Sequence, residues 1–372
     1  GDERSGHIRE VGFELYQSML EDAILAAKAG DMGLEAKPER VSPQITVDAP
    51  IMIPEDYVPD LAVRMALYRR LNDAADKAEI EALAKAYDAK LEVTRGDQLE
   101  QNSPLVHAVG RAAARHHAPR IMHLTWGKKD APVLAIVGKG VTFDSGGLDI
   151  KSSTGMALMK KDMGGAAHAI ALAKLVMQHN LPVRLHLLVP AVENAISGNA
   201  LRPGDIVKSR KGLTVEITNT DAEGRLILAD ALDRASEENP ELLIDFATLT
   251  GAARVALGPD YPALMTRRDE TAEALISAGK AHDDEPWRLP LPGIYREWLD
   301  SPLADCINAP TNGFAGASVA GLFLDQFVGE DIDWAHFDTY AWRPTARPGR
   351  PKGGEAYGLR ASWHMLRERF GA

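Results

Sequence analysis

The fold is decided by a stretch that reads VLAIVGKGVTFDSGGLDIK (133–151), where a short apolar run passes into glycines and charged residues. Residues 133–138 have the length and the β-branched content of a buried strand. Lys139, Asp144 and Lys151 then follow at the end of that strand. Ligand sites of open α/β sheets collect at the carboxyl ends of strands. The stretch therefore predicts a central strand that leads into a binding site.

The same alternation continues on both sides of this stretch. Further short apolar runs occupy residues 121–126, 183–192, 214–220 and 241–249, and helical periodicity covers residues 163–179, 225–238 and 313–328. Strands separated by helices of this length need crossover connections. We therefore expect an α/β fold with a mixed, mainly parallel sheet flanked by helices.

Two more clusters place acidic residues among glycines, GMALMKKDMGG (155–165) and NTDAEGRL (219–226). Charges in such surroundings are costly unless they are paired or bound to metal. The three clusters together supply four carboxylates: Asp144, Asp162, Asp221 and Glu223. Four negative charges match two divalent cations, and oxygen ligands suit Mn²⁺, Mg²⁺ or Zn²⁺. Asp221 and Glu223 are two residues apart, so an extended segment would point them the same way.

Each of these residues has an ordinary structural interpretation when it is taken alone. A single aspartate fits a helix cap or a surface ion pair, and Arg225 fits a salt bridge. Lys139 alone would be a solvated charge, because metal binding needs its neutral amine. The prediction of a dinuclear metal site depends on their occurring together.

Composition excludes several other classes of protein. The net charge of −11 argues against a nucleic-acid-binding surface, and no run of apolar residues is long enough to span a membrane. The single cysteine, Cys306, and the charged first residues favour a cytoplasmic protein. The His-Glu-x-x-His, Gly-x-Ser-x-Gly and P-loop patterns are missing.

The histidines show no pattern that indicates a metal site. Those at 107, 116, 117 and 123 have no recognisable ligand spacing. His168 lies inside an expected helix, where a core or capping role is predicted.

The segment NTDAEGRL (219–226) matches the signature of the leucyl aminopeptidases, the M17 class of metallopeptidases. Residues 90–372 resemble the catalytic domain of that family, with ENAISGNALRPGD (193–205), DFATLTGA (245–252) and WAHFDTYAW (334–342) in the same order and spacing. The resemblance implies a cytoplasmic homo-hexamer that hydrolyses the N-terminal residue from peptides, using a water bridged by two metal ions.

The resemblance also implies roles for individual residues. One Zn²⁺ or Mn²⁺ ion would be bound by Asp144, Asp221 and Glu223, and the other by Lys139, Asp144, Asp162 and Glu223. One ion would also bind the free α-amine of the peptide.

Lys151 would stabilise charge on the substrate carbonyl, and Arg225 would hold a bicarbonate ion that acts as general base. Met159, Thr248, Leu249 and Gly251 would lie near the bound peptide. Ordinary core packing is the alternative for Met159.

Residues 1–85 do not resemble the usual N-terminal domain of that family. They are similar to the C-terminal region of the bacterial transcription-repair coupling factor, without its ATPase motifs. We expect a small α+β segment of different origin, with helices at 11–29 and 61–86 and an edge strand within 45–60. The chain would then be a fusion or a misjoined reading frame. The alternative function is a non-catalytic DNA-repair-related binding module carried by this segment.

Overall fold

The computed structural model describes residues 78–371. The helix expected at 11–29, the edge strand within 45–60 and nearly all of the 1–85 segment therefore lie outside the described residues. The end of the helix expected at 61–86 is described, and it is helical as α3 (Ala78–Ala86).

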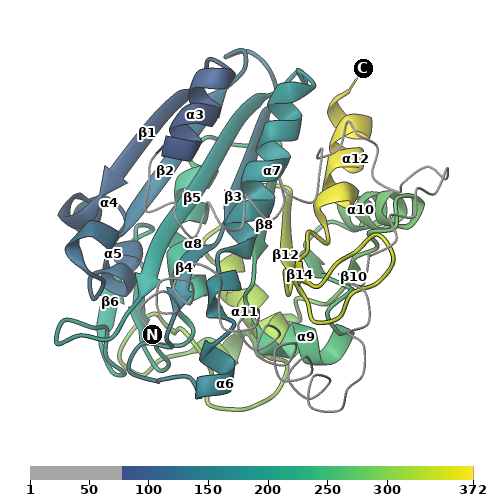
Figure 1. The fold of residues 1–372 in the computed structure, drawn as a ribbon. Coiled ribbons are helices and arrows are strands. Elements are labelled where there is room, and N and C mark those ends of the chain that lie inside the picture. Colours follow the sequence, from purple (N-terminus) through teal and green to yellow (C-terminus); the bar gives the residue numbers. More distant parts are fainter. Residues whose placement is uncertain (1–77, 372) are drawn as a thin grey trace, which may run out of the picture. The chain divides into compact units, whose positions relative to one another are not determined.

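A nine-stranded mixed sheet runs through this part of the chain, in the order β1-β2-β5-β3-β8-β12-β9-β10, with β4 paired to β5 (Figure 1). The strands are β1 (Lys90–Arg95), β2 (Arg120–Trp126), β3 (Val133–Gly138), β4 (Gly140–Asp144), β5 (Arg184–Asn194), β8 (Leu242–Ala247), β9 (Ala263–Thr266), β10 (Trp287–Arg288) and β12 (Trp334–Asp338). The four central strands β5, β3, β8 and β12 are parallel to one another, whereas the pairs β1–β2, β2–β5 and β12–β9 are antiparallel. The mixed, mainly parallel sheet expected from the sequence is confirmed.

The longer helices are α5 (Pro104–Gly110), α7 (Gly164–Gln178), α8 (Glu223–Ser236), α9 (Gly251–Leu257), α10 (Asp269–Ala281), α11 (Gly316–Asp325) and α12 (Leu359–Phe370). Shorter helical elements are α4 (Leu99–Asn102), α6 (Ser153–Met156) and the 3-10 turn η3 (Met159–Lys161). The helices expected at 163–179, 225–238 and within 313–328 are confirmed as α7, α8 and α11.

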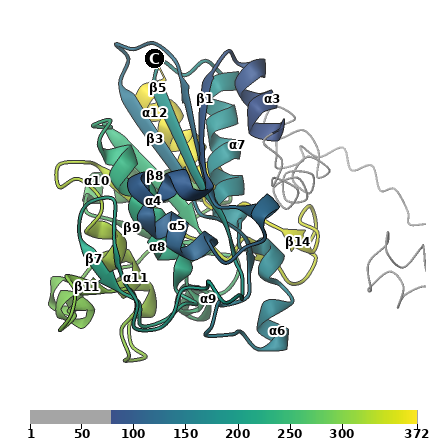
Figure 2. The ribbon, with the colours of Figure 1, turned by 90° about the vertical axis from the view of Figure 1, so that its left-hand side faces the viewer.

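Helices cover both faces of the sheet, with α3 and α7 on one side and α5 and α8 on the other (Figure 2). Successive residues of a strand point to opposite faces, so the apolar strands supply two cores. Leu134 and Ile136 of β3 join the core formed with α7. Ala135 and Val137 join the core formed with α8. Burial on both faces explains why these strands read as continuous apolar runs.

Helix α7 approaches the sheet closely because its first turn contains glycine. A Cβ on Gly165 would lie 2.2 Å from the carbonyl oxygen of Phe246 in β8, and a Cβ on Gly138 would lie 2.6 Å from the Cα of Ala166. Both contacts are with backbone, which cannot swing away as a flexible side chain can. The two glycines therefore set the distance between α7 and the strands that carry the charged clusters.

The expectation of a strand over residues 214–220 was wrong in part. Only β7 (Thr214–Glu216) is a strand, and it belongs to a separate three-stranded sheet with β6 (Ile206–Lys208) and β11 (Cys306–Ile307). Ile217 N donates to the backbone carbonyl of Asp205 at 2.8 Å. The backbone N–H groups of the residues after it donate to side chains instead of a neighbouring strand. Asn308 Oδ1 accepts from Thr218 N at 2.8 Å, and Asp149 Oδ2 accepts from Thr220 N at 2.7 Å. Side-chain bonds of this kind compete with strand pairing.

Within residues 78–371, no helix combines the length and the apolar character needed to cross a bilayer.

The glycine contact predicts a stability difference between two matched substitutions. Gly165→Ala should lower the thermal-melting midpoint, because overpacking against fixed backbone costs about 1–3 kcal/mol or more. Gly198→Ala meets nothing within 4 Å, so its effect should stay within about 0.5 kcal/mol. Melting curves followed by circular dichroism would measure both, and equal midpoints for the two variants would contradict the close contact.

Candidate metal centre

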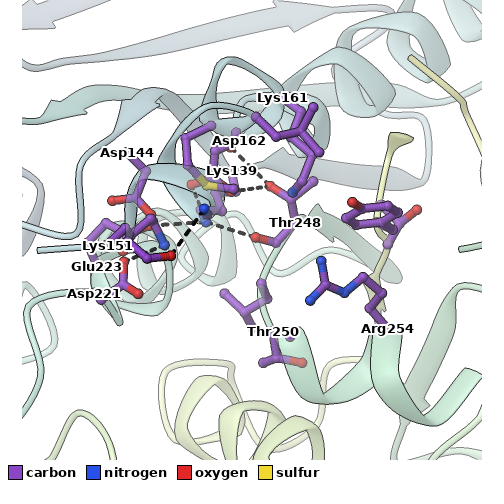
Figure 3. Close-up of a pocket in the computed structure, with 18 of the residues that line it drawn as sticks. Lys139, Asp144, Lys151, Lys161, Asp162, Asp221, Glu223, Thr248, Thr250 and Arg254 are labelled. Carbon is purple, nitrogen blue, oxygen red and sulfur yellow. Dashed lines mark hydrogen bonds and ion pairs between the residues drawn. The ribbon is translucent and has the colours of Figure 1, made fainter. Parts of the chain in front are cut away.

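The charged clusters come together at the carboxyl ends of the central strands. Lys139 follows β3, Asp144 ends β4, and Asp162 follows η3 just before α7 begins. Asp221 and Glu223 lie where the loop after β7 enters α8. All five line one cavity of about 480 Å³, as Figure 3 shows. The structure therefore brings together every residue that the sequence suggested as a metal ligand.

The ammonium group of Lys139 is at the centre of this arrangement. Its Nζ lies 2.7 Å from Asp162 Oδ2 and 3.1 Å from Glu223 Oε1, and it donates to the carbonyl oxygen of Thr248 at 2.9 Å. Burial alone would lower the pKa of Lys139, but the carboxylates of Asp162 and Glu223 raise it above the ordinary value. A metal ion that used this amine as a ligand would first have to displace its proton.

Lys151 joins the other two carboxylates. Its Nζ lies 2.9 Å from Asp144 Oδ2 and 2.5 Å from Asp221 Oδ1. The other oxygen of Asp144 accepts from Gly146 N at 2.9 Å and from Asn194 Nδ2 at 2.8 Å. Asp144 is thus fixed from both sides, and Asn194 is a positioning residue that sequence reasoning had not singled out. The only sequence signal for Asn194 was its position within the stretch ENAISGNALRPGD (193–205).

Burial and neighbouring charge shift the pKa of three of the carboxyl groups. Burial raises the pKa of Glu223 to about 8, and the charge of Asp144 adds to the effect. Burial and Asp144 likewise raise the pKa of Asp221 to about 6. Burial also opposes ionisation of Asp144, but Lys139 and Lys151 hold its pKa below the ordinary value. The four carboxylates carry more negative charge than the two lysines neutralise, which favours the binding of cations.

Free carboxylate oxygens show that the residues fit a metal. Asp162 Oδ2, Asp221 Oδ1 and Glu223 Oε2 are buried with no hydrogen-bond partner among the described residues. The first two form ion pairs with the ammonium groups of Lys139 and Lys151, and Glu223 Oε2 has no such contact among the described residues. One oxygen from each of Asp144, Asp221 and Glu223 lies within 4.8 Å of the others, as a shared ion requires.

The expectation that Asp221 and Glu223 share an extended segment was wrong. Asp221 is in a turn, and Glu223 is the first residue of α8. Two hydrogen bonds fix the turn that contains Asp221. Asp221 N donates to Asn219 Oδ1 at 2.8 Å, and Asn308 Nδ2 donates to the carbonyl of Asn219 at 2.6 Å. Asn308 was not anticipated either, because it lies far along the chain.

The residues expected near a bound peptide are placed in the same cavity. Met159, Thr248, Leu249 and Gly251 all line it. Arg225 is not among the lining residues. Its Nη1 donates to the carbonyl of Asn308 at 2.8 Å, and its Nε has no hydrogen-bond partner among residues 78–371. Burial lowers the pKa of Arg225 to about 10. The roles of these residues stay predictions.

A second group of potential ligands lies away from the cavity and was missed in the sequence. His123 on β2 and His186 on β5 meet at 3.0 Å, and Glu238 Oε2 lies 3.7 Å from His186 Nε2. Arg234 Nη2 lies 3.3 Å from His123 Nδ1, which completes a chain of polar contacts. His168 is buried against the carbonyl of Gly164 at 2.7 Å, as expected for a core residue.

Comparisons with known proteins agree with this geometry. Residues 67–362 match the family described as "Cytosol aminopeptidase family, catalytic domain". The chain is 40% identical to the probable cytosol aminopeptidase of Corynebacterium efficiens over 85% of this chain and 63% of that protein. It is 44% identical to Peptidase B of Pectobacterium carotovorum, over 74% of this chain and 64% of that protein. The chain thus spans less than two thirds of the length of these curated relatives.

Two solved structures share the fold. Cytosol aminopeptidase from Coxiella burnetii superposes with a TM-score of 0.77 and 53% identity, covering 82% of this chain and 65% of that one. The bottromycin maturation enzyme BotP in complex with Mn superposes with a TM-score of 0.76 and 37% identity, covering 82% of this chain and 70% of that one.

The site predicts that divalent cations stabilise the protein. Adding Mn²⁺ should raise the melting midpoint, since an ion at a hundredfold excess over its Kd contributes about 2.7 kcal/mol. Glu223→Gln should lose most of this increase, because it removes an unpartnered oxygen and its charge. Asp130→Asn, at an exposed residue outside the cavity, should keep it. If Mn²⁺ and Zn²⁺ leave the melting midpoints of all three proteins unchanged, the metal centre is contradicted.

Proposed function

The chain belongs to the cytosol aminopeptidase family, and on that premise we propose that it removes N-terminal residues from peptides in a metal-dependent, leucyl-type reaction. The observation that carries the proposal is the convergence of four carboxylates, three of them buried, and two lysines on one cavity. Thr248, Leu249 and Gly251 also line this cavity.

Two divalent ions, Zn²⁺ or Mn²⁺, are proposed to occupy this site. Asp144, Asp221 and Glu223 would hold one, and Lys139 and Asp162 would complete the second with shared oxygens of Asp144 and Glu223. The unpartnered oxygen of Glu223, and the oxygens of Asp162 and Asp221 whose only described partners are lysine ammonium groups, support this assignment. Such ions supply a nucleophilic water at neutral pH and polarise a carbonyl oxygen. The name of the Mn-bound BotP structure supports manganese as one candidate.

Lys151 is proposed as the residue that binds the substrate carbonyl oxygen. Its side chain is partly exposed to the cavity, and its ammonium already contacts Asp144 and Asp221. Burial would lower the pKa of Lys151, but the charge of Asp144 raises it above the ordinary value, so the group stays protonated. A fixed ammonium there stabilises the negative charge that develops on the oxygen during attack.

Arg225 is proposed to hold a bicarbonate ion as general base. A buried guanidinium with an unpartnered Nε supports an anion site, because buried donors are normally satisfied. No carboxylate forms an ion pair with Arg225 among the described residues.

Peptide positioning is proposed for the remaining cavity residues. The carbonyl of Leu249 is offered to the substrate as a hydrogen-bond acceptor. Leu249 N is held by Asp338 Oδ1 at 3.0 Å, which fixes this loop. Met159 and Thr248 line the cavity and both hydrogen-bond to Asp162, which supports contact with the substrate.

Four further features remain proposals. A cytoplasmic location is supported by the names of the cytosol aminopeptidase relatives. Assembly as a hexamer and the boundary between a 1–85 segment and a 90–372 catalytic domain stay predictions. The resemblance of residues 1–84 to the coupling factor also stays a prediction, and the alternative of a DNA-repair binding module has no support from the relatives.

Hydrolysis of leucine p-nitroanilide tests the proposed function. The metal-loaded protein should release p-nitroaniline, and a chelator should stop the release. Lys151→Met should lower kcat by about 10²–10³, because the substrate oxygen loses its charged donor. Lys128→Met removes an exposed lysine outside the cavity and should keep full activity.

The alternative hypothesis, a non-catalytic binding module, predicts a different result in the same assay. A non-catalytic binding module would show no turnover in the folded, metal-loaded protein, and its affinity for DNA would survive Asp221→Asn. An aminopeptidase loses turnover in Asp221→Asn without unfolding. Folded, metal-loaded protein that releases no p-nitroaniline would refute the proposed reaction.

A further inference from the structure

A second cavity lies towards the opposite edge of the sheet from the metal centre. It has a volume of about 560 Å³ and shares no lining residue with the metal-centre cavity. Thr266, the last residue of β9, lines it and pairs with Ala335 near the start of β12. Asp338, which holds Leu249 beside the metal centre, is at the other end of β12. The second cavity is therefore separate from the site described above.

Three arginines line this cavity, which we call the arginine cavity. They are Arg267 directly after β9, Arg288 in β10 and Arg296 in the 3-10 helix η4 (Gly293–Leu299). Among the described residues, Asp325 at the end of α11 is the only acid that lines it. The lining residues therefore carry an excess of two positive charges.

The single acid, Asp325, is buried and already engaged. Its Oδ1 lies 2.6 Å from Arg267 Nε, and its Oδ2 pairs with Arg296 Nη2. Arg267 is used inside the protein, because its Nη1 donates to the carbonyl of Gly329 at 2.7 Å and its Nη2 to the carbonyl of Asp325 at 2.9 Å. One carboxylate thus serves two guanidinium groups and cannot neutralise both.

Arg296 and Arg288 keep donors for a ligand. Half of the Arg296 side chain is exposed, and only its Nη2 has a hydrogen-bond partner among residues 78–371. Arg288 Nη1 lies 2.6 Å from Asp269 Oδ1, and its Nη2 donates to the carbonyl of Thr266 at 3.4 Å. The Asp269 side chain is 76% exposed and does not line the cavity. Exposed ion pairs contribute little, so Asp269 holds Arg288 only weakly.

We propose that the arginine cavity binds a phosphate group, through Arg288 and Arg296. Guanidinium groups bind phosphate oxygens with paired hydrogen bonds, and a dianion matches the excess of two positive charges. The volume is in the range of small-molecule sites and exceeds that of phosphate alone. Leu289, Pro290 and Leu291 line the rest of the cavity and suit the less polar part of a phosphate ester. The group comes either from such an ester or from free inorganic phosphate.

Calorimetric titration of the metal-loaded, dialysed protein tests this proposal, with inorganic phosphate and adenosine monophosphate as the two probes. Both probes carry close to two charges at about pH 8. At least one should bind saturably at constant ionic strength. Arg288→Gln and Arg296→Gln should each weaken its Kd by about tenfold or more, the loss expected for one charge-assisted contact. Tighter binding of the nucleotide assigns the site to an ester, and equal or weaker binding assigns it to free phosphate.

Arg369→Gln is the matched control, because Arg369 pairs with the buried Asp333 at 2.6 Å and lines neither cavity. It should keep the wild-type Kd. Arg296→Gln leaves Arg267 paired with Asp325, so this variant should fold even if Arg288→Gln does not. Absence of saturable binding of both probes overturns the proposal. Binding that the folded arginine variants retain also overturns it, because that binding belongs to another site such as the metal ions. Neither result bears on the proposed aminopeptidase reaction.

Discussion

The structure depends on holding four carboxylates together in a buried cavity. Like charges at such separations repel strongly in a medium that screens them poorly. Lys139 and Lys151 offset part of this repulsion, each by contacting two of the carboxylates. Burial raises the pKa of Glu223 and the charge of Asp144 adds to the effect, so further positive charge in the cavity would favour its ionised form. The neighbouring groups therefore have to be placed where they stabilise these charges.

The fold meets this requirement through the ends of its parallel strands. Because β3, β5 and β8 run in the same direction, the loops that follow them meet at one edge of the sheet. Gly165 lets α7 approach β8, which brings Asp162 close to Thr248. The side chain of Asn194 then links the end of β5 to Asp144.

Much of this could be predicted from sequence because the signals are local. Buried strands such as 133–138 read as apolar runs, and the metal-ligand candidates stand in glycine-rich motifs. Contacts between distant residues carried no such signal. His123 meets His186 only because β2 pairs with β5. The direction of Glu223 was mispredicted because α8 begins at that residue.

The central claim is that the four carboxylates of the cavity bind a pair of cations. Metal content tests it most directly, measured by mass spectrometry after the protein is loaded with Mn²⁺ or Zn²⁺ and dialysed. The account predicts two bound ions per wild-type chain, and fewer in a folded Asp144→Asn variant because that aspartate would serve both ions. Wild-type protein that retains no ion, or a variant that retains as many as wild type, would contradict it.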